Sequence, residues 1–334
     1  MKAQFVRELA EGARVDAVFA LSTREMRSSR TGEAYLALEL SDRSGRIPAV
    51  LFRPSAEAAA VPKHSVVRIT GIVTVYRGRK RVSVEHIAVA SRYDATDLLP
   101  GPKKERAETR AEFKGLVRSV RDRELGRVLR AVFGDTQFLD RFSTCPGAQT
   151  HHHAYLGGLL EHTVAVASIC RHLAALYDEI DRDMLVTAAL LHDIGKTDEL
   201  RFRTSIEYTD EGRLLGHVVL GERRVREAVA RKCPDISSRT LTRLSHALLS
   251  HHGELEWGSP KRPSTVEALA LHHADNMDAK AAGFLALLPH ASSVEEGWTD
   301  TDNLFRRPLS VPTPADTDRP SAAREDDEYL LAMA

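Results

Sequence analysis

Residues 189–196 read ALLHDIGK, an apolar helix end that runs directly into a histidine and an aspartate. In the helix predicted for residues 183–194, His192 follows Ala188 by four residues and therefore lies on the apolar face. Asp193 comes next, although a buried ionised carboxylate costs free energy unless it is paired or coordinates a metal ion. The stretch therefore predicts a helical domain with a polar site in its interior.

Other predicted helices repeat this pattern, each with one metal-ligand residue on an apolar stripe. They are His162 in residues 153–176, His251 in a helix that begins near Thr240, and Asp275 in a helix that begins near Ser264. His217 in LLGHVV and His252 beside His251 supply two more imidazoles. Taken singly, each position is explained by a satisfied core histidine, a charge at a helix C-terminus or a solvated side chain. Together, on separate segments, they predict a metal centre and hence a phosphohydrolase.

The motifs also resemble those of a known superfamily. His162, the pair His192 and Asp193, and Asp275 match the H…HD…D pattern of the HD-domain metal-dependent phosphohydrolases. The longer stretches HHAYLGGLLEHT, ALLHDIGK, LLSHHGELEWGSP and LHHADNMDAK resemble one branch, the YhaM-type 3′–5′ exoribonucleases, in which an OB-fold precedes the HD domain. The resemblance extends to about Leu288.

The resemblance implies a centre of two divalent ions that share Asp193. The implied ligands of the first ion are His162, His192, Asp193 and Asp275, and those of the second are Asp193, His217, His251 and His252. A single ion held by fewer of these residues is also compatible with the sequence. Mixed imidazole and carboxylate ligation suits manganese, iron, cobalt, nickel or zinc, and the resemblance favours manganese.

Asp193 and Lys196 are the predicted catalytic residues. Asp193 would hold the two ions together, and Lys196, about one turn past His192, is close enough to contact the scissile phosphate. The alternative for Lys196 is that it only complements the dipole at the end of its helix. Further predicted substrate contacts in this domain are His152, His153 and Lys280.

The N-terminal part of the chain has the pattern of a β-barrel. Five segments rich in branched and aromatic residues are predicted strands, at residues 16–21, 34–40, 46–52, 65–75 and 81–90. A short AEAAA helix near Ala56 follows the third strand, which is the order of an OB-fold. The predicted fold class is therefore a multi-domain chain, with an all-β OB-fold barrel followed by an all-α HD domain.

Two loops of this barrel are predicted to bind a single strand through basic and aromatic side chains. The first is residues 22–33, with Arg24, Arg27 and Arg30, and the second is the turn YRGRKR, with Tyr76, Arg77, Arg79, Lys80 and Arg81. The candidate stacking platforms are Tyr35, Phe52 and Tyr76. The alternative is that Phe52 fills the barrel and the arginines are only surface charges.

Charge and composition divide the chain further. Residues 1–110 hold 20 Lys and Arg against 13 Asp and Glu, although the whole chain has no net charge. A basic N-terminal part favours a polyanionic partner. Pro100, Gly101 and Pro102 break the β pattern. We expect an OB-fold domain at residues 1–96, a linker at 97–109, an HD domain at 110–288 and an acidic, Pro-rich tail at 289–334.

Cysteine usage and hydropathy bear on the compartment. Cys145, Cys170 and Cys233 are far apart, which fits a reducing cytoplasm and argues against a cysteine-ligated zinc. We expect no membrane span, and the segment MKAQFVRELAEG lacks the apolar core of a signal peptide. The chain is therefore expected in the cytoplasm.

The expected function is a metal-dependent 3′–5′ exoribonuclease. It would hydrolyse single-stranded RNA to nucleoside 5′-monophosphates by attack of a metal-activated hydroxide, and the sequence leaves DNA open as a substrate. The 3′–5′ direction rests on the resemblance alone. One alternative is an HD-type phosphodiesterase of cyclic or free nucleotides, because the same centre serves both. A second, of another class, is a nucleic-acid-binding protein with an inert HD domain. The sequence leaves the oligomeric state open.

Overall fold

The computed structural model of this chain describes residues 2–29, 32–76, 78–99, 101, 106–149, 153–202, 206–288, 297–299, 301 and 303–311. Contacts divide it into two compact units, with the boundary after Asp278. The first unit contains a β-barrel and a helical domain, which are described separately below.

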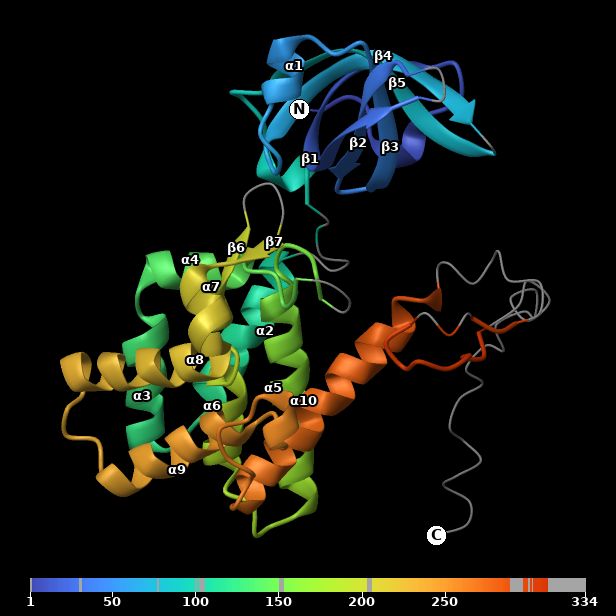
Figure 1. Ribbon diagram of the computed structural model, residues 1–334. Coiled ribbons are helices and arrows are strands. Elements are labelled where there is room, and N and C mark those ends of the chain that lie inside the picture. Colours follow the sequence, from blue (N-terminus) through green and yellow to red (C-terminus); the bar gives the residue numbers. More distant parts are fainter. Residues whose placement is uncertain are drawn as a thin grey trace. The chain divides into compact units, whose positions relative to one another are not determined.

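The N-terminal domain is a closed five-stranded barrel (Figure 1). Its elements are β1 (Arg14–Ser28), β2 (Ala34–Asp42), β3 (Gly45–Phe52), α1 (Ala56–Ala60), β4 (Val66–Tyr76) and β5 (Arg79–Val89). The order around the barrel is β1-β2-β3-β5-β4, with β3 and β5 parallel and the other pairs antiparallel. Closure leaves no free sheet edge, and Phe19, Leu36 and Ile69 fill the interior. The predicted OB-fold, with its helix after the third strand, is confirmed.

The predicted binding loops of the barrel are shorter than expected. Strand β1 continues to Ser28 because its second half pairs with β2, so Arg24 and Arg27 are strand residues and not loop residues. Strand β5 already begins at Arg79, so Arg79, Lys80 and Arg81 also lie in a strand. Gly78 takes the turn with φ 76°. Arg30 and Arg77 lie outside the described residues.

The second domain is helical. Its elements are α2 (Arg106–Ser119), α3 (Arg123–Phe133), α4 (Thr136–Thr144), α5 (Gly158–Leu176), α6 (Arg182–Leu191), α7 (Lys196–Glu199), β6 (Leu200–Phe202), β7 (Ile206–Tyr208), α8 (Asp210–Lys232), α9 (Ser238–Ser250) and α10 (Val266–Leu285). The all-α prediction is wrong in one detail, because β6 and β7 form a small antiparallel hairpin. Helix α2 begins at Arg106, inside the range predicted as linker.

One apolar core unites these helices. Phe113, Phe133 and Phe142 pack together from α2, α3 and α4, with ring centroids 4.9 to 5.4 Å apart. Helices α5 and α6 lie deepest, and every residue from Met184 to Leu191 is buried. By length and composition α5 could cross a membrane, contrary to expectation, although half of its apolar window is buried among the described residues. Its inward residues belong to the shared core, as in the core helix of a globular domain.

Helix ends differ from the predicted bounds in ways that matter for the site. Helix α5 starts at Gly158, and His153, predicted within it, has a left-handed backbone with φ 55°. Helix α6 ends at Leu191, which leaves Asp193 in a turn. Helix α10, predicted to begin near Ser264, is capped by Thr265, whose hydroxyl accepts a hydrogen bond from the Ala268 N–H.

The second unit begins at Ala279, within the second half of α10. A bridge joins Trp298 to Ser310, and the rings of Phe284 and Phe305 pack edge to face at 5.9 Å. Most of the predicted tail, including residues 312–334, lies outside the described residues.

Candidate metal centre

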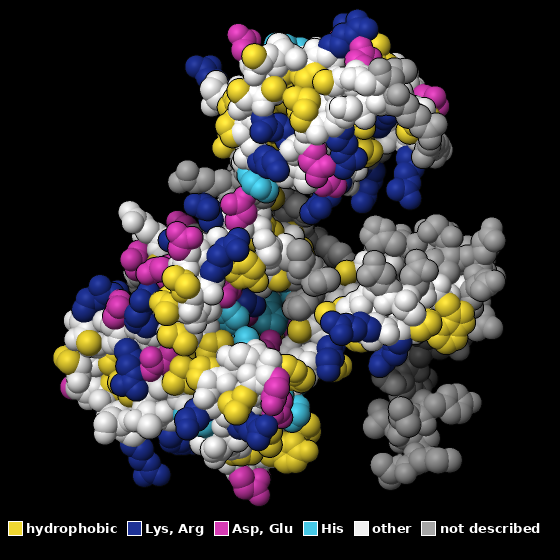
Figure 2. Space-filling view, viewed as in Figure 1, with side chains coloured by type: hydrophobic (Ala, Val, Ile, Leu, Met, Phe, Trp, Pro, Cys, Tyr) yellow, Lys and Arg dark blue, Asp and Glu magenta, His cyan; other side chains and the backbone are white. Residues whose placement is uncertain are grey.

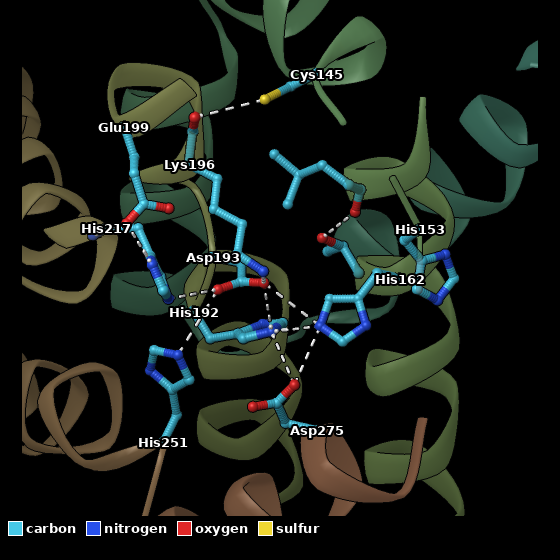
Figure 3. Close-up of polar contacts among 12 residues, drawn as sticks. Cys145, His153, His162, His192, Asp193, Lys196, Glu199, His217, His251 and Asp275 are labelled. Carbon is cyan, nitrogen blue, oxygen red and sulfur yellow. Dashed lines mark hydrogen bonds and ion pairs between the residues drawn. The ribbon is translucent and has the colours of Figure 1, made fainter. Parts of the chain in front are cut away.

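Four side chains from α5, α6 and α10 converge at the first half of the site (Figure 3). His162 projects from α5, His192 caps the C-terminus of α6, and Asp275 comes from α10. His162 Nε2 lies 3.1 Å from Asp275 Oδ1 and 3.4 Å from Asp193 Oδ2. His192 Nε2 is 3.5 Å from the same Asp193 oxygen. His162, His192 and Asp193 lie close enough together to hold one metal ion, and Asp275 lies beside them.

Three histidines form the second half. His217 follows Gly216, whose φ of 73° interrupts α8 and turns the chain at this point. His251 caps α9, and His252 comes directly after it. His217 Nε2 lies 3.3 Å from Asp193 Oδ1, and His251 Nε2 lies 3.7 Å from that oxygen. His217, His251 and His252 also lie close enough together to hold a metal ion.

Asp193 lies between the two groups. Its Oδ2 faces His162 and His192, whereas its Oδ1 faces His217 and His251. A carboxylate placed this way can give one oxygen to each of two ions. Figure 2 shows histidine side chains in a recess of the helical domain. The structure thus brings together all seven residues that the sequence suggested as ligands.

The ring orientation of the five histidines tests whether they fit a metal. Each Nδ1 contacts an oxygen at the periphery: Asp278 Oδ2 for His162 (2.7 Å), the Ala189 carbonyl for His192 (2.7 Å), Glu199 Oε1 for His217 (3.0 Å), the Leu248 carbonyl for His251 (2.7 Å) and the Trp257 carbonyl for His252 (2.9 Å). A carbonyl only accepts, so Nδ1 carries the proton in those rings. In a neutral ring Nε2 then presents a lone pair to the centre.

These inward nitrogens need a cation between them. His162 Nε2 and His192 Nε2 are 3.1 Å apart, and so are His217 Nε2 and His252 Nε2. His251 Nε2 is buried without a hydrogen-bond partner among the described residues. Two lone pairs at this distance repel each other, and an unpaired buried nitrogen costs free energy. A divalent ion on each side of Asp193 would satisfy all of them, so the donor set fits a metal centre.

Comparisons with known proteins agree with this geometry. The HD domain family matches residues 159–280, and an OB-fold nucleic acid binding domain family matches residues 20–90. The chain is 33% identical over 279 residues to the 3′–5′ exoribonuclease YhaM of Bacillus subtilis, covering 80% of this chain and 86% of that protein. It is 32% identical over 290 residues to the protein of that name from Listeria monocytogenes, covering 85% and 91%. The chain belongs to the YhaM family of 3′–5′ exoribonucleases. The resemblance inferred from the motifs is confirmed.

Protonation in this YhaM-family centre favours metal binding for two of the imidazoles. Burial lowers the pKa of His192 to about 4, and burial with the neighbouring His251 and His217 lowers that of His252 to about 3. Burial opposes ionisation of Asp193, but Lys196 and the imidazoles outweigh it and hold its pKa well below the usual range. Neutral imidazoles and an ionised carboxylate are the forms that coordinate a metal.

Lys196 lies against the bridging carboxylate. Its Nζ is 2.6 Å from Asp193 Oδ2, and the contact is buried. Burial disfavours the ammonium, but Asp193 raises its pKa, so the side chain is cationic. The predicted alternative, a side chain that only complements a helix dipole, therefore does not describe it. Lys196 adds a fixed positive charge to the centre of this family member.

Two carboxylates that sequence reasoning did not assign support the ligands. Asp278 Oδ2 contacts both His162 Nδ1 and His153 Nε2, the latter at 3.0 Å, and Glu199 holds His217. His153 in turn contacts the Tyr155 hydroxyl at 3.1 Å. Carboxylates behind metal-binding histidines fix the tautomer and orientation of the ring. Asp278 could have been found, because it follows Asp275 by three residues on the same helix face.

The other residues of the helical domain that were predicted to contact the substrate differ in where they lie. His153 belongs to the network around Asp278, whereas His152 lies outside the described residues. Lys280 is exposed on α10, in the second unit.

The barrel of this family member presents an aromatic row on its outer face. Arg27 pairs with Tyr35 across β1 and β2, and Tyr35 pairs with Phe52 across β2 and β3. The rings of Tyr35 and Phe52 are 5.6 Å apart, and Phe52 is 44% exposed. The alternative in which Phe52 fills the barrel is therefore wrong.

The other basic residues predicted to bind a strand differ in whether they have structural partners. Arg24 donates to the Ala59 carbonyl and Lys80 donates to the Leu9 carbonyl at 3.0 Å, so both have structural partners. Arg81 lies over the exposed Tyr76 ring at 4.4 Å, and Arg79 is exposed. A cation beside an aromatic face is the kind of surface on which single-strand bases stack.

Proposed function

We propose that this chain is a metal-dependent exonuclease that shortens single-stranded RNA from its 3′ end and releases nucleoside 5′-monophosphates. The observation that carries the proposal is Asp193, with its two oxygens turned to two groups of inward-facing imidazole nitrogens. Membership in the YhaM family supports the reaction class and the direction. Exposed aromatic rings on the barrel, Phe52 and Tyr76 with Arg81 over the latter, support a polymeric substrate.

Different residues of the chain would have different roles in the hydrolysis. Bound divalent ions would supply charge neutralisation at the phosphate and an activated water. His162, His192, Asp275 and Asp193 would hold one ion, and His217, His251, His252 and Asp193 the other. Lys196 keeps Asp193 ionised and places a cation beside it, where it would also stabilise negative charge that develops on the phosphate.

The two alternatives have less support. A phosphodiesterase of cyclic or free nucleotides has no need for a basic barrel, whereas similarity to the exoribonucleases spans 80% or more of this chain. Residues 20–90 also match an OB-fold nucleic acid binding domain. An inert HD domain has no need to hold five imidazole rings in a ligand orientation. We further propose manganese as the working metal and the cytoplasm as the compartment, on the family resemblance and on the spacing of the cysteines.

The deciding experiment is digestion of a 5′-labelled RNA with the full chain and added manganese. We expect a ladder of progressively shorter labelled strands, with unlabelled nucleoside 5′-monophosphates as products. Parallel reactions with zinc, with EDTA, with single-stranded DNA and with a cyclic dinucleotide compare metals and substrates. Immediate release of labelled mononucleotide, a single internal cut, or turnover of the cyclic dinucleotide alone would overturn the proposal.

A further inference from the structure

Trp257 is an exposed tryptophan beside the second group of histidines. It ends the short 3-10 helix η3 (Leu255–Trp257), and 54% of its surface is exposed. Isolated exposed hydrophobic side chains are common on soluble proteins, so exposure alone indicates nothing. What distinguishes Trp257 is that one contact joins it to His252 of the metal centre and another joins it to His272, which itself contacts His251.

Both contacts lead to adjacent ligands. The Trp257 carbonyl accepts a hydrogen bond of 2.9 Å from His252 Nδ1, so its backbone is separated from the inward-facing Nε2 only by the width of one imidazole. The indole ring lies 5.9 Å from the ring of His272, which contacts the His251 carbonyl at 2.9 Å through Nδ1. The position of Trp257 is thereby coupled to His251 and to His252.

The loop from Gly253 to Trp257 is held in place by its own contacts. Gly253 has φ 80° and packs against His272 so closely that a Cβ would lie 2.3 Å from that ring. The Trp257 N–H donates to the Glu254 carbonyl at 3.1 Å, and Glu254 forms an ion pair of 2.9 Å with Arg262. An aromatic ring on such a loop is held before substrate arrives, which lowers the entropic cost of binding.

We infer that Trp257 is the platform on which the base of the 3′-terminal nucleotide stacks while its phosphate lies at the metal centre. The inference rests on the proposed exonuclease function and adds a recognition element to it. Every base has a π face, so stacking tolerates any sequence, which suits an enzyme that removes nucleotides in succession. An indole gives the largest stacking surface of any side chain.

Fluorescence provides a direct test, because the chain has two tryptophans, Trp257 and Trp298. In the full chain carrying Trp298→Phe, Trp257 is the sole tryptophan. We would titrate it with manganese and a dinucleotide whose phosphonate linkage resists hydrolysis, and with the same compound lacking the 3′ base. We expect saturable quenching by the first and little by the second. Equal quenching, or none by either at saturating concentrations, would overturn the inference.

Kinetics give a second test that separates stacking from a structural role. Base stacking of roughly 1–3 kcal/mol predicts that Trp257→Ala raises the KM for an intact dinucleotide by about 5- to 150-fold. Trp257→Phe should retain most of the binding, and Leu255→Ala, which alters an equally exposed neighbour, should change KM little. Metal content should be normal in all three, because the Trp257 carbonyl and not its indole holds His252.

The abasic dinucleotide completes the comparison. If the indole stacks on the base, Trp257→Ala and the parent chain cleave the abasic compound with similar KM. An equal loss on both compounds, or a loss of bound metal in Trp257→Ala, would show a structural role and overturn the inference. Absence of any hydrolysis by the parent chain would instead refute the proposed function, so the two failures can be told apart.

Discussion

The metal centre and the barrel surface of this chain are built in opposite ways. In the centre, each inward imidazole is held by a second bond through its Nδ1, and the bridging Asp193 is buried and paired with Lys196. On the barrel, Phe52, Tyr76 and Arg79 are exposed, and Arg27 makes a surface ion pair of 2.5 Å with Glu25. This difference indicates that a metal centre requires donor atoms in fixed positions, whereas a surface that binds strands of any sequence tolerates exposed side chains.

The sharpest test of the comparison is Asp193→Asn. A neutral amide cannot balance two cations, so we expect activity to fall to background while the fold is retained. Metal per chain, activity on RNA and the far-ultraviolet circular dichroism spectrum would be measured. Asp210→Asn, which neutralises an exposed carboxylate at the start of α8, is the matched control. Near-normal turnover with full metal loading would refute the shared bridge.

The carboxylates behind the ligands should have the next largest effect. Asp278→Asn and Glu199→Gln replace the carboxylates that hold His162 and His217 with neutral amides, and loss of such partners typically weakens metal affinity about 10- to 100-fold. Calorimetric titration of metal-stripped protein with manganese would measure the change. Unchanged affinity in both folded variants would mean that the backbone alone orients the rings.

Substitutions on the barrel surface should weaken the binding of long strands without abolishing hydrolysis. Replacing Arg77, Arg79, Lys80 and Arg81 with Ala should weaken binding of long single strands and flatten its salt dependence, because fewer counterions are released. Cleavage of a dinucleotide, which need not reach the barrel, should change little. Equal losses on long and short substrates would mean that these residues support the fold.

Within the aromatic row, the contribution of each ring can be measured singly. Tyr35→Ala and Phe52→Ala should each weaken long-strand binding by roughly 1–3 kcal/mol if a base stacks there. Exposed Val89→Ala, at the end of β5, serves as a control on the barrel. Fluorescence anisotropy of a labelled RNA would measure binding, and an effect equal to that of the control would exclude the row from the interface.

The metal centre and the barrel also differ in how much of each can be predicted from the sequence. The ligands were found because a histidine or aspartate on an apolar helix face violates burial rules, so His162 and Asp275 stand out. The barrel strands are predictable from their branched and aromatic residues, but the extent of β1 is not, because its second half is set by pairing with β2 rather than by its own hydropathy. The role of Glu199 could not be predicted from the sequence, because its contact with His217 depends on the turn at Gly216, which brings distant residues together.

The smallest expected effect tests the scaffold that carries Asp275. The N-terminus of α10 is fixed by the Thr265 hydroxyl, which accepts from Ala268, and by Glu267, which is buried and pairs with Arg243 at 3.1 Å. Thr265→Ala should lower the free energy of unfolding by about 1 kcal/mol, the usual value of a lost N-cap. Ser264→Ala should change it little, because Ser264 does not cap the helix. Urea unfolding of both variants would measure the difference, and equal destabilisation would restore Ser264 as a cap. Metal content should be normal in both, since the cap lies about three turns from Asp275, so a scaffold can lose stability without losing the centre that it holds.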